Sequence, residues 1–118
     1  MDLRDNLLRL MFPSGMLDYF TLVKVTQLYK DGGVEVELEE NPAVPSEFPD
    51  RENYICHGFH EWQLVHDHPL RGAIFNLRIH RRRWLNKKTK EVRSRDWKLV
   101  AKGTSLSQEF ADFLKELH

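Results

Sequence analysis

Two stretches of this chain alternate strictly between apolar and polar side chains, and this alternation limits the fold more than any other feature. Between residues 34 and 39, valine and leucine alternate with glutamate. Between residues 75 and 80, phenylalanine, leucine and isoleucine alternate with asparagine, arginine and histidine. Because successive side chains of a β-strand point to opposite faces, each stretch predicts a strand with one buried and one outer face.

Helical patterns lie at the two ends of the chain. Residues 2–11 place leucine and methionine on one face, and Pro13 with Gly15 ends the predicted helix. Residues 105–117 carry an apolar stripe and begin with Ser105 and Gln108, the spacing of a capping box. We therefore expect a short N-terminal helix and a C-terminal helix.

The intervening segments read as strands and turns. Residues 19–29 are β-branched and aromatic, and a glycine-containing turn at 30–33 joins them to the first alternating strand. Another strand ends near residue 67, and the turn at 68–72 leads into the second alternating strand. A polar turn at 86–90 precedes residues 92–99, which predict a returning strand through Trp97 and Val100.

These elements predict an α+β fold built from antiparallel β-hairpins with a helix at each end. A chain of 118 residues is the size of one domain. Within a single domain over 1–118, we expect a helix and hairpin in 1–40 and a basic ribbon with the last helix in 54–118. Between them, residues 41–53 contain three prolines and predict a surface connection.

The net charge of zero conceals a strong internal division. Residues 71–102 carry twelve Arg or Lys against two acids, whereas residues 1–70 carry thirteen acids against five basic side chains. A cationic stripe beside aromatic rings suits the phosphate backbone of nucleic acid, because each bound cation releases condensed counterions. The alternative is a solvated strand face whose arginines only aid solubility.

The candidate nucleic-acid contacts all lie in this basic segment. Arg78, His80 and Arg82 have the spacing that places them on one strand face, whereas Arg81 and Arg83 point the other way. A two-stranded ribbon fits the major groove of DNA, and most of its contacts go to phosphates. With five or six phosphates neutralised, the log–log salt slope is expected to be about −5. The predicted DNA-binding residues are Arg71, Arg78, His80, Arg81, Arg82, Arg83, Lys87, Lys88, Lys90, Arg93 and Arg95. Substituting Arg82 or Lys88 by alanine is predicted to weaken binding without disturbing the fold.

The same segment resembles a family of mobile-element proteins. The run HDHPLRGAIFNLRIHRRRW, the turn KTKE, SRDWKLVAKGT and the helix SQEFADFLKE resemble the N-terminal region of ISAon-type insertion-sequence transposases. GMLDYFTLVKV and VELEENPAVPSEFPDRENYICHGFHEW, nearer the start, fit as well, so the resemblance covers nearly the whole chain.

A more distant similarity links residues 69–84 to the zinc-ribbon region of ISL-type transposases, in which cysteine pairs hold a strand pair with zinc. Those pairs are absent here, since only Cys56 with His57 stands near the first knuckle. The resemblance therefore implies a metal-free, zinc-ribbon-like second half, which we expect Trp62, Trp84 and Trp97 to hold together.

The resemblance implies a non-catalytic DNA-binding region that recognises double-stranded DNA at the element ends during transposition. The alternative is a protein-interaction module that docks a separately encoded catalytic transposase subunit through the acidic face of Glu35, Glu37 and Glu39 and the C-terminal helix. That acidic face would also allow self-association into a homo-oligomer. The chain begins with Met1 and its last helix reaches the end, so we expect a complete chain. Without a signal peptide, a long apolar run or a second cysteine, we expect a cytoplasmic protein with no membrane partner.

No cofactor, metal site or enzymatic activity is expected. The candidate metal ligands are Cys56, His57, His60, His66, His68 and His80, but the turn near residue 70 pairs 66 with about 76 and leaves His80 near 62. They do not converge as a closed zinc site requires. The carboxylates lie in hairpins and connections with no scaffold for a two-metal phosphoryl-transfer site. A His-dependent metal enzyme is the third reading.

Overall fold

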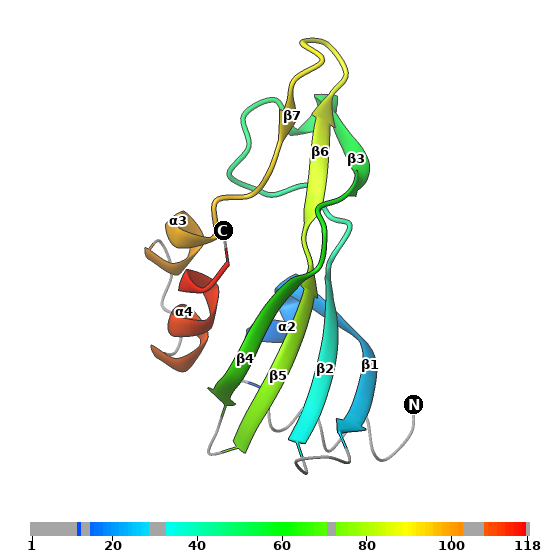
Figure 1. Ribbon diagram of the computed structural model, residues 1–118. Coiled ribbons are helices and arrows are strands. Elements are labelled where there is room, and N and C mark those ends of the chain that lie inside the picture. Colours follow the sequence, from blue (N-terminus) through cyan, green and yellow to red (C-terminus); the bar gives the residue numbers. More distant parts are fainter. Residues whose placement is uncertain (1–11, 13–14, 29–32, 71–72, 103–107, 118) are drawn as a thin grey trace.

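A computed structural model describes residues 12, 15–28, 33–70, 73–102 and 108–117. The fold is α+β, with seven strands in two sheets, a short helix near the N-terminus and a helix near the C-terminus (Figure 1). The strands are β1 (Phe20–Leu28), β2 (Gly33–Glu40), β3 (Tyr54–Phe59), β4 (Gln63–Leu70), β5 (Ala73–His80), β6 (Arg82–Asn86) and β7 (Val92–Arg93). The helices are α2 (Met16–Tyr19), the 3-10 turn η1 (Arg51–Asn53), α3 (Trp97–Lys102) and α4 (Gln108–Lys115).

The four-stranded sheet joins the two alternating stretches of the sequence. Its order is β1-β2-β5-β4, in which β1–β2 and β4–β5 are antiparallel hairpins. The hairpins meet through parallel pairing of β2 with β5, which sets Glu37 opposite Arg78. The acidic strand and the basic strand, 41 residues apart at these positions, are therefore direct neighbours.

The three-stranded sheet extends the molecule away from the first sheet. Its order is β3-β6-β7, and all its pairs are antiparallel. Residues 60–62 lead from β3 into β4, and Arg81 alone separates β5 from β6, so one long ribbon crosses both sheets. We call this passage, made of residues 60–62 and Arg81, the waist. The molecule is correspondingly elongated, with extents of 48 × 28 × 27 Å (Figure 1).

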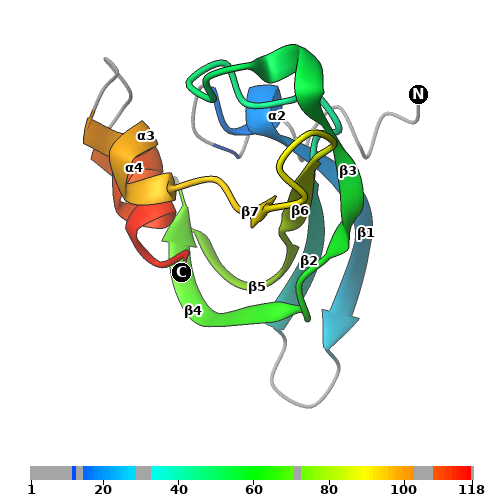
Figure 2. The same ribbon diagram turned by 90° about the horizontal axis from the view of Figure 1, so that it is seen from above.

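The main core lies on one side of the four-stranded sheet, where α2, α3 and α4 gather (Figure 2). Phe75, Leu77 and Ile79 are buried there, as the alternation predicts. Phe110, Phe113, Leu114 and Leu117 are buried too, so the stripe of the C-terminal helix is confirmed as a core face. The ring of Phe20 stacks on that of Trp97 at 4.9 Å, which joins β1 to α3.

A second, small core stabilises the three-stranded sheet. It consists of Phe48, Tyr54 and Trp84, with Val44 packed against it. Phe48 and Val44 come from the proline-containing connection, which thus covers one face of this sheet. Since Trp84 has no exposed surface, one ring fills most of this core.

The predicted strand over residues 92–99 is wrong in its second half. β7 ends at Arg93, and residues 97–102 form α3 instead. Asp96 caps this helix, because its Oδ1 accepts hydrogen bonds from the backbone N–H groups of Lys98 and Leu99. Trp97 and Val100 are buried while the two residues between them are exposed, which is helical spacing.

The three tryptophans do not hold one ribbon together, which corrects that expectation. Only Trp84 lies in the core of the three-stranded sheet. Trp97 belongs to the main core, and Trp62 lies at the waist beside His80. The helix predicted over 2–11, the capping residue Ser105 and most of the turn at 30–33 fall outside the described residues. In the described part of the chain, no helix is long and apolar enough to cross a membrane.

Candidate nucleic-acid interface

On the outer face of the four-stranded sheet, glutamates of β2 form ion pairs with arginines. The guanidinium of Arg78 contacts Glu37 at 3.0 Å and Glu35 at 3.6 Å. Farther along, Arg82 contacts Glu39 at 3.2 Å. The glutamates predicted as an acidic docking face are thus the counter-ions of two arginines predicted to bind DNA.

The same two arginines also stack on aromatic rings. The imidazole of His80 is nearly parallel to the rings of Phe59 and Trp62, with centroids 4.0 and 4.1 Å away. Two parallel rings at that distance must lie on opposite faces of the imidazole. Arg82 lies over Phe59 at 4.5 Å and Arg78 over Trp62 at 4.9 Å. Arg78, His80 and Arg82 therefore share one face, as their spacing predicts, but they form a stacked column with two aromatic rings.

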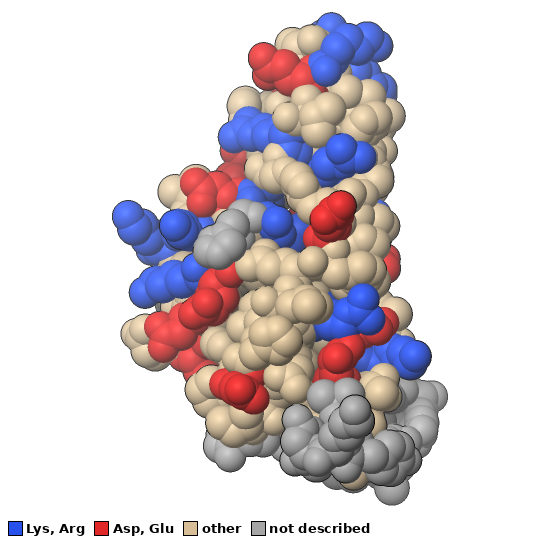
Figure 3. Space-filling model, in the orientation of Figure 1, with Lys and Arg blue, Asp and Glu red and all other residues tan. Residues whose placement is uncertain are grey.

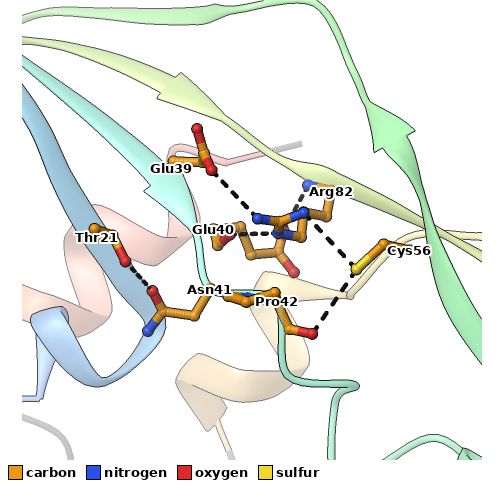
Figure 4. A network of polar contacts seen from close by, with 7 residues as sticks. All are labelled: Thr21, Glu39, Glu40, Asn41, Pro42, Cys56 and Arg82. Carbon is orange, nitrogen blue, oxygen red and sulfur yellow. Dashed lines mark hydrogen bonds and ion pairs between the residues drawn. The ribbon is translucent and has the colours of Figure 1, made fainter.

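A buried carboxylate lies where this column reaches the waist (Figure 4). Only 3% of Glu40 is exposed, and its Oε1 accepts a hydrogen bond from the backbone N–H of Arg82 at 2.9 Å. Arg82 Nε donates to the backbone oxygen of Glu40, and Arg82 also contacts the sulfur of Cys56. Burial raises the pKa of Glu40, while the Arg82 N–H, the charge of Arg95 and the nearby Trp84 indole act in the opposite direction. The Trp84 N–H is not aligned for a hydrogen bond.

Arg95 is also engaged. Its Nε and terminal nitrogen donate to both carboxylate oxygens of Glu47, at 2.8 and 2.9 Å. The guanidinium lies over the rings of Tyr19 and Trp97. This two-pronged pair fastens the proline-containing connection to the main core, so Arg95 is a structural residue and not a free cation.

The turn between β6 and β7, residues 87–90, presents its cations differently. Asn86 is buried, and its Oδ1 accepts hydrogen bonds from the backbone N–H groups of Lys88 and Thr89. The backbone N–H of Lys90 donates to the backbone oxygen of Asn86 at 2.8 Å, and Lys90 has a φ of 66°, a conformation that favours glycine or asparagine. The backbone of this turn is therefore well defined by hydrogen bonds.

The lysine side chains of this turn point outward. Lys87, Lys88 and Lys90 are exposed, and none forms an ion pair with a residue that the structure describes. Arg93, exposed on β7, lies over the ring of Phe48 at 4.3 Å. Positive charge accordingly gathers at the far end of the molecule, with Glu91 as the acid within the turn segment (Figure 3). We call Lys87, Lys88, Lys90 and Arg93 the basic tip.

Arg81 and Arg83 form a third group at the waist and the start of β6. Each Nε atom is buried and lacks a hydrogen-bond acceptor. Neither guanidinium forms an ion pair within the described part of the chain. Burial lowers the pKa of His60, and the charges of Arg81 and Arg83 lower it further, so all three side chains are neighbours. Arg71, the remaining predicted contact, lies outside the described residues.

The histidines and the cysteine are dispersed. His66 lines an open depression of about 210 Å³ with Glu35 and Arg78, whereas His68 packs edge-on against Phe113. The ring of His60 is hydrogen-bonded to Ser94, and His57 is exposed on β3. Among the described residues, no three His, Cys, Asp or Glu side chains lie close enough together to hold a metal ion.

Several structural partners escape prediction from the sequence. Glu40, Glu47, Phe59 and Trp62 hold arginines that come from distant parts of the chain, and no local pattern announces such pairings. Asn86 is different, because an asparagine that opens a polar turn is a recognised signal for side-chain to backbone hydrogen bonds. That signal identifies the turn that presents the lysines.

Comparisons with protein-family models, with curated proteins and with solved structures found no match for this chain. The similarity to ISAon-type transposases therefore stays a prediction from the residues.

Proposed function

We propose that this protein binds double-stranded DNA through the basic tip, as a non-catalytic recognition region of an insertion-sequence transposase in the cytoplasm. The observation that carries the proposal is the display of three exposed lysines, without ion-pair partners among the described residues, on a hydrogen-bonded turn. A phosphate backbone offers the matching negative charge, and flexible ammonium groups at the end of a β-ribbon can reach it.

The proposal assigns the arginines of the sequence prediction to different tasks. Arg78, Arg82 and Arg95 stabilise the fold, because their charges already meet carboxylates at 2.8–3.2 Å. With Lys87, Lys88, Lys90 and Arg93 as the phosphate contacts, the log–log salt slope falls to about −3.6 instead of −5. Contacts of this kind fix position and affinity, whereas selectivity for element ends would need base contacts in addition.

The absence of catalysis in this proposal rests on the acids. Glu35, Glu37, Glu39 and Glu47 lie within 4 Å of arginines, which would compete with any metal ion for their oxygens. Two-metal phosphoryl transfer requires convergent carboxylates that are free to bind cations. The resemblance to the N-terminal part of a transposase supports the same division, with the chemistry supplied by another region or another chain.

The experiment is a titration of labelled duplexes at three salt concentrations, with element-end and scrambled sequences side by side. Lys87→Gln/Lys88→Gln is compared with Lys24→Gln/Lys115→Gln, which removes the same charge from exposed positions on β1 and α4. Lys90 is left unchanged so that the two variants lose the same number of charges. We expect the tip variant to lose about ten- to a hundredfold in affinity at 0.1 M salt, with a slope shallower by about two.

Equal losses in the two variants would mean that only net charge matters and would overturn the assignment to the tip. If the unaltered protein binds neither duplex at low salt, the proposal fails. Co-purification with a catalytic transposase subunit would then support the protein-interaction module.

A further inference from the structure

We propose that Arg81, Arg83 and Ser94 form a binding site for a phosphate group at the waist, separate from the basic tip. The inference does not depend on DNA binding by the tip, because its test uses inorganic phosphate. It concerns two guanidinium groups that form no ion pair with a residue that the structure describes.

The contrast with the other arginines of the same segment supports an unfilled site. Arg78, Arg82 and Arg95 each meet a carboxylate at 3.2 Å or less. Arg81 and Arg83 have buried Nε atoms without an acceptor among the described residues, although buried N–H groups in folded proteins are nearly always hydrogen-bonded. Guanidinium groups carry only donors, so an external acceptor is the partner that these atoms need.

The strand pairing places Arg81, Arg83 and Ser94 near His60. The backbone N–H of His60 donates to the Arg81 oxygen at 2.8 Å, and the His60 ring is hydrogen-bonded to Ser94. The charges of both arginines act on that ring, where they and burial lower the pKa of His60. Residues from the waist, β6 and the segment after β7 are therefore gathered around one imidazole.

Arg83 lies close to Gly58 of β3. It has a φ of 74°, and a Cβ added to it would lie 3.5 Å from the terminal nitrogen of Arg83. The guanidinium thus lies against the bare backbone of β3, at a strand position that favours glycine. This contact holds the group close to the sheet.

The chemistry favours phosphate over a single carboxylate. Two guanidinium forks and one hydroxyl offer more donors than the two oxygens of a carboxylate can accept, whereas a phosphate group offers three or more. The charge of Glu40 acts on Arg81, but the two side chains form no ion pair. Both arginines are only partly buried, so part of each side chain outside the buried Nε atom meets solvent.

The test follows the Nε–H resonances of ¹⁵N-arginine-labelled protein during titration with sodium phosphate at pH 7. Sodium chloride at equal ionic strength provides the reference. We expect the Arg81 and Arg83 resonances to shift saturably with phosphate, more than that of the exposed Arg51, which lies outside both proposed sites. Arg83→Gln should weaken phosphate binding at least about tenfold, the effect of losing one charge-assisted contact.

Two further variants separate a loss of phosphate binding from poor folding and from a general effect of charge. Arg83→Lys retains the charge but not the fork and should fall between the unaltered protein and Arg83→Gln, even if the latter folds poorly. Arg51→Gln, at an exposed position outside both proposed sites, should leave the shifts of Arg81 and Arg83 unchanged. Shifts no larger with phosphate than with chloride, or equal at Arg51, would overturn the site.

A parallel titration with a short duplex identifies the source of the phosphate group. It is carried out in the Lys87→Gln/Lys88→Gln background, where the contribution of the tip is weakened. Saturable shifts with the duplex alone support a phosphodiester, and shifts with inorganic phosphate alone support a free phosphate or phosphate monoester. If neither ligand moves the resonances more than chloride does, the proposal is rejected.

Discussion

Basic side chains near the waist and at the tip are treated in opposite ways. Arg78 of the four-stranded sheet and Arg82 at the start of β6 pair with glutamates and stack on aromatic rings. In the three-stranded sheet, Lys87, Lys88 and Lys90 project from the tip without such partners among the described residues. The difference shows that an excess of positive charge along the sequence does not measure the charge that a ligand would meet.

The two sheets also differ in how they are stabilised. Fourteen buried residues form the core beside the four-stranded sheet, against three in the small core of the other, counted over the described part of the chain. The small core depends on one tryptophan and on a connection held by the Arg95–Glu47 pair. The proposed binding surface thus belongs to the part of the molecule that has the smaller hydrophobic core.

The largest expected effect tests this dependence. Trp84→Ala should lower the free energy of unfolding by about 3–5 kcal/mol, since it removes a fully buried ring and leaves a cavity. Amide hydrogen exchange should show β3 and β6 losing protection before β2 and β5. The matched control is Trp62→Ala, which removes a half-buried ring from the stacked column and should cost less. Uniform loss of protection across both sheets would contradict the division.

The second effect concerns Arg82, which begins β6 next to the waist. Arg82→Ala removes an ion pair, a hydrogen bond to the Glu40 backbone and a guanidinium stacked on Phe59, so we expect a loss of about 1–3 kcal/mol in urea unfolding. This replaces the sequence-based expectation that the change leaves the fold intact. Lys88→Ala serves as the exposed control and should stay within about 0.5 kcal/mol. Equal stability of the two variants would contradict a structural role for Arg82.

The third, smaller effect is expected when Arg78 loses its counter-ions and is left unpaired, like the lysines of the tip. Glu35→Gln/Glu37→Gln removes the counter-ions of Arg78, and duplex affinity should rise a few-fold with a salt slope steeper by about one. Glu52→Gln/Glu61→Gln removes two exposed acids as a control for net charge. If both pairs raise the affinity equally, pairing with Glu35 and Glu37 is not what restrains Arg78.

The smallest effect is a pH dependence. Because burial raises the pKa of Glu40 above its ordinary 4.5, the folded protein binds that proton more readily than the unfolded chain. Its stability contribution is complete below pH 4.5 and is lost as the pH rises through the folded pKa. Free energies of unfolding are measured for the unaltered protein and Glu40→Gln from pH 4.5 upward. The unaltered protein should lose stability relative to Glu40→Gln as the pH rises. Parallel curves would show that Glu40 titrates as an ordinary carboxyl.

Local patterns predicted much of this fold. The alternations at 34–39 and 75–80 lie in β2 and β5, with Val36, Leu38 and Leu77 buried. The stripe of the last helix faces the core, and His80 lies beside Trp62 as the register of the second hairpin predicts. Residues 97–102 were expected to continue a strand because they include aromatic and β-branched residues, but they form a helix. The Asp96 cap and the packing of Trp97 into the main core favour that helix.

By itself, the sequence determined β1, β2, β5 and the C-terminal helix, the faces of the two alternating strands and the position of the lysine-rich turn, because each depends on residues a few positions apart. It placed the end of β4 and the segment after β7 wrongly. Only the tertiary structure decided which cations are free. The parallel pairing of β2 with β5 brings glutamates of the first half beside arginines of the second. Coulomb attraction depends on distance in space, and separation along the chain does not determine that distance. The lysines of the tip extend beyond this pairing, and so they keep their charge available to solvent and ligand.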